Sequence, residues 1–183
     1  MAISWDQQRP RVVSVRWRAG GLDDLTLLGV ALGVLPRDRV MLDGAVDTRP
    51  SDAAAIGQSE QLRDYLRRQI TVARGDASCA AEFVAPVDAK SGITIDYTCS
   101  APVGTATIAV RTLTDLNPAY RTLASGPGGK RAVYTADDDS HTWALGPPNA
   151  RKTASVLVTA AAGALLAVVL VLLVVRRKRR TGS

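Results

Sequence analysis

The chain has 183 residues, with 23 Lys or Arg, 17 Asp or Glu and a single His, for a formal net charge of +6. Five of the basic residues follow residue 175, so the remaining 18 leave only +1 for everything before them. We therefore expect no nucleic-acid partner. The chain contains no P-loop, GxGxxG turn or GxSxG motif, and a Ser–His–Asp triad could use only His141, so we expect no enzyme.

The first half of the chain predicts a strand, a helix, a loop and a second helix. Alternating valine and tryptophan predict a strand over Arg11–Trp17, and a short apolar segment closed by glycine predicts a helix over Leu22–Gly33. The buried side of that helix is expected to consist of Leu25, Leu28, Val30, Leu32 and Leu35. The segment Leu35–Ala55 is rich in Pro, Asp and Gly and is predicted to be loop.

The second helix is predicted over Ser59–Ile70, where apolar residues recur at helical spacing. Its buried face is expected to consist of Leu62, Tyr65, Leu66 and Ile70. We expect Ser59 to be the N-cap, with the acidic Glu60 in the first turn.

A run of strands follows the second helix. Gly92–Cys99 and Thr105–Leu113 both alternate apolar and polar residues. Shorter strands are expected at Ala132–Thr135 and Thr142–Leu145, with a turn at Gly126–Gly129. This order of elements predicts a mainly β (α+β) fold, a small antiparallel β-sandwich-like domain with two short helices.

Cys79 and Cys99 are the only cysteines, and two cysteines alone cannot complete a structural zinc site. In an exported domain they would form one disulfide, which would stabilise the fold by roughly 3 kcal/mol. In a reducing compartment they would be two buried thiols. We expect the disulfide.

The segment Thr153–Val175 has 23 residues and no charge, long enough for a transmembrane helix. A buried helix of a soluble domain is the alternative, but a chain this short offers little core to cover it. Arg151 and Lys152 precede the segment. The basic residues that follow it, expected to anchor the helix against anionic lipid, are Arg176, Arg177, Lys178, Arg179 and Arg180.

Five basic residues after the segment against two before it predict a cytoplasmic C-terminus and an extracytoplasmic N-terminal domain. We thus expect a β-rich domain over 1–146, a Pro-containing linker over 147–152, a transmembrane helix over 153–175 and a basic tail over 176–183.

Export requires a signal, and the first residues are too polar to be a signal peptide. Either the natural start lies upstream, or the protein is tail-anchored with its domain inside. We expect the former, because the latter would place the basic tail outside. Thr159 and Gly163 have the spacing of a helix-packing motif, for which another copy or a separate permease would be the partner. An ordinary lipid-facing alanine-rich helix is the equal alternative.

Four stretches of the domain resemble a known family in their order and spacing. They read LRDYLRRQITVARGDASC, GITIDYTCSAPVG, RTLTDLNPAYRTLASG and AVYTADDDSHTWALG. The chain resembles the extracytoplasmic N-terminal domain of the HupE/UreJ family in its actinobacterial form, over roughly Val12–Gly146. Thr114–Tyr120 and the two cysteines carry most of the resemblance.

The resemblance implies a β-rich domain outside the membrane, followed by a multi-helix permease that handles nickel or cobalt. The chain departs from that pattern, because its single predicted span contains no His, Asp, Glu or Cys and could not conduct an ion alone. We therefore expect a single-pass binding or accessory module of the cell membrane, beside a multi-span permease or another membrane-complex subunit. The alternative is a structural or interaction subunit, or a permease remnant, with no ligand of its own.

The acidic stretch before the only histidine is the candidate metal site. Asp137, Asp139 and His141 could bind nickel, cobalt or zinc loosely. Neighbouring residues of a strand point to opposite faces, so these three and Asp138 cannot all converge unless the stretch is a loop. We favour an acidic turn between two short strands, with Trp143 and Leu145 directed into the core or resting at the membrane interface.

Overall fold

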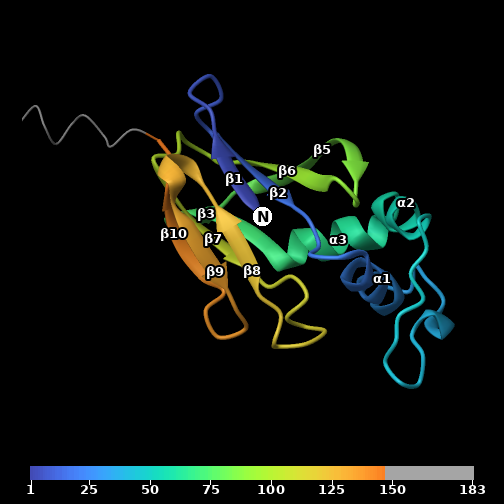
Figure 1. Cartoon of the computed structure of the whole chain (residues 1–183). Helices are drawn as coiled ribbons and strands as arrows, with labels where there is room; N and C mark the ends of the chain where they lie inside the picture. The colour runs from blue at the N-terminus through green and yellow to red at the C-terminus, as the bar shows by residue number, and fades with distance from the viewer. Residues whose placement is uncertain (147–183) are drawn as a thin grey trace, which may run out of the picture. The chain divides into compact units, whose positions relative to one another are not determined.

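The computed structural model describes residues 1–146, in which ten β-strands form two sheets (Figure 1). Among these residues, no helix combines the length and apolar character needed to span a membrane. The predicted linker, the predicted span with Thr159 and Gly163, and the basic tail lie outside the described residues.

The larger sheet has six strands in the order β5-β6-β2-β1-β8-β9. Their bounds are β1 Ala2–Trp5, β2 Val12–Trp17, β5 Ala80–Asp88, β6 Gly92–Thr98, β8 Thr122–Ser125 and β9 Arg131–Tyr134. Neighbouring strands are antiparallel except β1 and β8, which run parallel with Ala2 opposite Ser125. The predicted antiparallel arrangement is therefore found in four of the five strand pairings of this sheet and is wrong for the pairing of β1 with β8.

The smaller sheet has four antiparallel strands in the order β10-β7-β3-β4. Their bounds are β3 Ile70–Arg74, β4 Ala77–Ser78, β7 Thr105–Val110 and β10 Ser140–Ala144. The chain passes from β9 in the larger sheet to β10 in the smaller one, so the segment that contains the candidate metal residues connects the two sheets.

Three α-helices are present in residues 1–146, where two were predicted: α1 Leu22–Ala31, α2 Asp52–Gly57 and α3 Glu60–Gln69. Single 3-10 turns lie at Arg37–Arg39 and Pro127–Gly129. The helix α2 corrects the end of the loop predicted over Leu35–Ala55. Its alanine-rich residues form a short helix although the segment before them is rich in Pro, Asp and Gly. Figure 1 shows α1 and α2 together at one end of the domain, away from β10 and β7.

The helix α3 begins as predicted, because the Ser59 hydroxyl accepts a hydrogen bond from the Leu62 N–H at 3.2 Å. Its predicted buried residues Leu62, Tyr65, Leu66 and Ile70 are all buried. On α1, Leu25 and Leu28 are buried as predicted. Leu32 and Leu35 are half-buried and pack against the core, whereas Val30 is half-buried without packing against it, which corrects the expectation for Val30.

One hydrophobic core receives side chains from both sheets and from α1, α2 and α3. The larger sheet contributes, among others, Val13, Val15, Ile93, Ile95 and Tyr97, and the smaller sheet contributes Ile70, Val72, Ile108 and Val110. Burying each large apolar side chain stabilises the fold by about 1.5–3 kcal/mol. The Tyr97 hydroxyl of β6 also donates to the Ile70 carbonyl at 2.9 Å, which joins the two sheets by a buried polar contact.

Cys79 and Cys99 form the expected disulfide, with their Cα atoms 4.3 Å apart. Cys79 lies between β4 of the smaller sheet and β5 of the larger one, and Cys99 follows β6. The Cys79 N–H donates to the Val72 carbonyl, and the Cys99 N–H donates to the Arg11 carbonyl, each at 2.9 Å. The disulfide therefore links the two sheets at a point where both backbones are already fixed.

Candidate functional site

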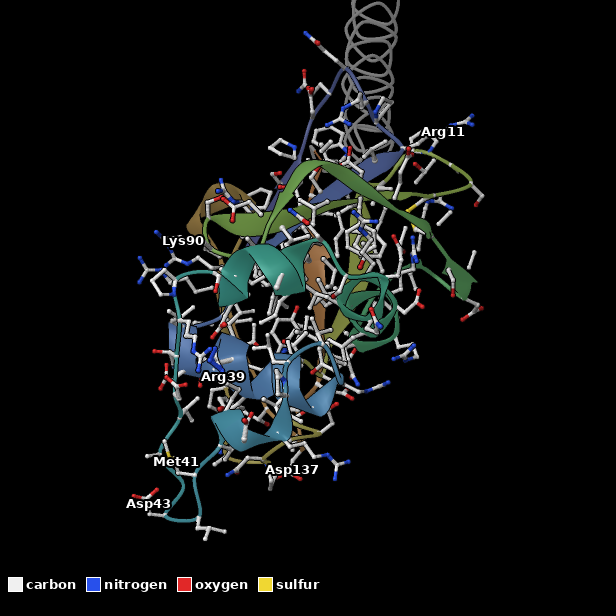
Figure 2. All side chains as sticks on the ribbon, turned by 90° about the vertical axis from the view of Figure 1, so that its right-hand side faces the viewer. Arg11, Arg39, Met41, Asp43, Lys90 and Asp137 are labelled. Carbon is white, nitrogen blue, oxygen red and sulfur yellow. A yellow bond between two sulfur atoms is a disulfide. The ribbon has the colours of Figure 1, made fainter. Side chains whose placement is uncertain are left out.

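The acidic stretch forms the connection between β9 and β10, as the turn interpretation predicted. The Thr135 N–H donates to the Asp138 carbonyl, and the Asp138 N–H donates back to the Thr135 hydroxyl, both at 3.0 Å. Asp137 lies exposed at the outer part of this turn (Figure 2). After it, Trp143 on β10 and Leu145 just beyond β10 are both buried, which agrees with the alternative that they are directed into the core.

The other two candidate ligands contact Arg111, which follows β7, and Val133 of β9. Arg111 donates from Nε to an Asp139 carboxylate oxygen at 2.5 Å. His141 lies on β10, with Nε2 at 3.0 Å from the Val133 carbonyl and 3.7 Å from the Asp138 carboxylate. Its ring meets the Tyr134 ring edge-on, with the centroids 4.6 Å apart.

These contacts account for the positions of Asp139 and His141 without a metal ion. Within residues 1–146, no three His, Cys, Asp or Glu side chains are grouped so that they could hold a metal ion. Asp137, Asp139 and His141 thus do not form a ready ligand set in this structure, and the nickel, cobalt or zinc hypothesis stays a prediction.

An apolar groove lies elsewhere, on the outer side of α1. It has a volume of about 330 Å³ and is lined by Leu27, Val30, Ala31, Val40, Leu116, Asn117 and Tyr120. The lining comes from α1, from the loop after it and from the loop between β7 and β8. Six of the seven residues are apolar or aromatic, so the groove suits an apolar side chain rather than a cation.

The loop between β7 and β8 is held rigidly where it borders the groove. Leu113 adopts φ +68°, a left-handed conformation that non-glycine residues rarely take. The Tyr65 hydroxyl fixes it, accepting from the Leu113 N–H at 2.7 Å and donating to the Asp115 carboxylate at 2.9 Å. Burial and the nearby Asp115 raise the pKa of Tyr65, so this hydroxyl keeps its proton. The loop therefore presents Leu116 in a fixed position.

The tyrosine beside the groove is fixed in the same way. The Tyr120 hydroxyl donates to the Asp24 carboxylate at 2.8 Å, which ties the β7–β8 loop to the first turn of α1. Burial and this hydrogen bond raise the pKa of Tyr120 to about 12. Both walls of the groove are thus connected by a hydrogen bond that persists at neutral pH.

A buried ion pair supports the loop on the other side of the groove. Arg39 Nη2 lies 2.5 Å from both Asp52 carboxylate oxygens, and Asp52 also accepts from the Thr26 hydroxyl and the Arg49 N–H. Burial alone would raise the pKa of Asp52. The hydrogen bonds from Arg39, Arg49 and Thr26, with the Arg39 charge, outweigh it and lower that pKa below its ordinary value.

Sequence patterns did not predict the groove. The one available indication was that α1 has almost no polar residues after Asp24, whereas its spacing predicts burial on one side only. The Arg39–Asp52 pair had no sequence signal, because it joins the predicted loop to a short helix that the composition did not predict.

Neither family models, nor curated proteins, nor solved structures gave a match to the chain.

Proposed function

We propose that the chain is a single-pass membrane protein whose 1–146 domain lies outside the cytoplasmic membrane as a non-enzymatic interaction module. In this role it resembles the ectodomain of a HupE/UreJ-type permease and serves as an accessory beside a membrane partner. We also propose that the two sheets pack in a sandwich-like manner and that residues 153–175 span the membrane.

The observation that carries the proposal is the Cys79–Cys99 disulfide in a domain that precedes a 23-residue uncharged segment and a basic run. Disulfides persist mainly in proteins exported from the reducing cytoplasm. The basic run after the uncharged segment favours a cytoplasmic C-terminus. Both features support the same topology, and they come from independent parts of the chain.

The chemistry of the surface favours contact with a protein over capture of a metal. The groove beside α1 is apolar, whereas Asp139 already pairs with Arg111 and His141 already contacts the Val133 carbonyl. Apolar grooves of this kind can receive apolar side chains of a partner protein, as in the docking of an amphipathic helix. The module thus acts by binding through α1 and the loops beside it.

Single-cysteine labelling in intact cells tests the topology. Leu123→Cys places a thiol on an exposed position of β8, and Thr181→Cys places one in the basic tail. A membrane-impermeant maleimide should label the first in intact cells and the second only after the membrane is opened. Labelling of Thr181→Cys with protection of Leu123→Cys would instead show a tail-anchored protein with its domain inside.

Metal capture is the second candidate function, and the observation in its favour is the placement of three aspartates within four residues of the only histidine. Titration of the detergent-solubilised chain with Ni²⁺, Co²⁺ and Zn²⁺ tests it directly. The interaction role predicts equal, weak binding by the wild-type chain and by His141→Ala. A dissociation constant that rises at least about tenfold in His141→Ala, a loss of about 1.4 kcal/mol, would favour metal capture.

A further inference from the structure

The helix α1 presents apolar side chains on two opposite sides. Leu25 and Leu28 point into the core and are buried. Leu27, Val30 and Ala31 line the groove on the outer side. A helix in a small domain normally has a polar outer face, and an apolar one indicates that something covers it.

An apolar loop tip projects beside this groove. Met41 is 54% exposed and Leu42 is fully exposed, at 111%. The tip is an ordered turn, because Val40 and Val46 form a β-bridge and the Met41 N–H donates to the Ala45 carbonyl at 2.8 Å. Figure 2 shows Met41 and Asp43 at the end of a loop that extends away from the body of the domain.

The base of this loop is fixed by the Arg39–Asp52 ion pair described above. Because the turn and its base are both held in place, little conformational entropy is lost when the tip binds. Full exposure of Leu42 also shows that the tip does not fill the groove of its own chain.

The tip and the groove carry complementary charges. Asp43 follows Leu42, and its carboxylate accepts only from the Ala45 N–H within its own turn. Arg121 follows Tyr120 at the groove, and its Nη1 donates to the Pro118 and Tyr120 carbonyls. Within the part of the chain that the structure describes, neither side chain forms an ion pair.

The occupant that fits these features is a second copy of the chain. The apolar lining suits an apolar side chain and the adjacent Arg121 suits a carboxylate, and Leu42 with Asp43 supplies both. Val40 both begins the tip and lines the groove, so the two features lie on one face. A twofold axis through that face makes each tip enter the other groove, and every contact is then made twice.

We propose that this face is a homodimer interface, in which Leu42 of each copy enters the groove beside Leu116 of the other and Asp43 pairs with Arg121. The dimer rests on the proposed interaction role and names its partner. A tip and a groove alone bury less than the roughly 1,200–2,000 Å² of a stable interface, so the dimer is weak and forms where chains are concentrated.

Disulfide cross-linking of the full chain in membranes tests the interface. Two differently tagged chains are co-expressed, one with Leu42→Cys and the other with Leu116→Cys, and membranes are oxidised briefly. The matched control replaces Leu116→Cys by Leu123→Cys, which is more exposed but lies on β8 outside the groove. The expected result is several-fold more heterodimer from the first pair than from the control pair.

A charge reversal tests the geometry in the same assay. Asp43→Lys on the Leu42→Cys chain should lower the cross-linked yield several-fold, and Arg121→Asp on the Leu116→Cys chain should restore it. Both positions are exposed, so neither change is expected to disturb folding.

Equal yields from the groove pair and the control pair would overturn the dimer. A cross-link from Leu116→Cys to a different protein would also overturn it, but would leave the interaction role standing. No cross-link between Leu116→Cys and Leu42→Cys would overturn the dimer alone, because a partner protein without a nearby thiol would leave the groove cysteine unlinked.

Discussion

Removal of the disulfide should lower the stability of the 1–146 domain by about 3 kcal/mol. Cys79 and Cys99 are 20 residues apart in sequence, so the bond closes a loop of that order. Loop closure of about 20 residues restricts the unfolded chain by roughly 3 kcal/mol at 25 °C. The Cys79→Ala/Cys99→Ala variant tests this, since alanine leaves no buried hydroxyl at Cys99.

Urea unfolding of the full chain in mild detergent, followed by tryptophan fluorescence, measures the loss. All three tryptophans lie in residues 1–146, and Trp17 and Trp143 are buried, so the signal reports on the domain. The reduced wild-type chain is the matched control and should lose about as much stability as the double variant. A loss below about 1 kcal/mol in both would refute the chain-entropy reasoning. A loss in the variant alone would show a packing effect of the cysteines.

Three further changes test other parts of the structure. The pKa of Asp52 is lowered in the folded chain, so the unfolded chain binds more protons in acid. The melting temperature should therefore fall as the pH drops below about 4, and it should fall more steeply in the wild-type chain than in Asp52→Asn. The same pH dependence of the melting temperature in both would contradict this. In Gly126→Ala the new Cβ would lie 2.5 Å from the buried ring of Trp143, which should cost about 1–3 kcal/mol, whereas Gly104→Ala meets open space and should be nearly neutral in urea titrations. Ser59→Ala removes the cap of α3 and should cost about 1 kcal/mol by thermal melting; no change would mean that the cap is dispensable.

Local sequence patterns predicted the elements that contain a strong periodic signal. The helix α3 has its cap and an apolar face in one short segment. In β6 the apolar residues Ile93, Ile95 and Tyr97 alternate strictly with polar residues. The strands β7, β9 and β10 and the turn at the acidic stretch were also predicted near their observed positions.

The missed elements lack such a signal. The strand β3 starts at the last residue of the predicted helix, with no glycine or proline to mark the change. The strand β5 contains Pro86, which is tolerated because β5 lies at the edge of its sheet. The parallel pairing of β1 with β8 joins segments about 120 residues apart, which no local pattern reveals. The groove depends on the same long-range packing, since α1 and Leu116 meet only in the folded chain.

Protease accessibility of an N-terminal epitope in intact cells, read on a non-reducing gel, tests the central claim most directly. An exported and anchored module predicts digestion from outside, together with a mobility change on reduction that is absent in Cys79→Ala/Cys99→Ala. Full protection of the epitope, with both thiols free in the wild-type chain, would contradict the proposed topology and the interaction role outside the cell membrane.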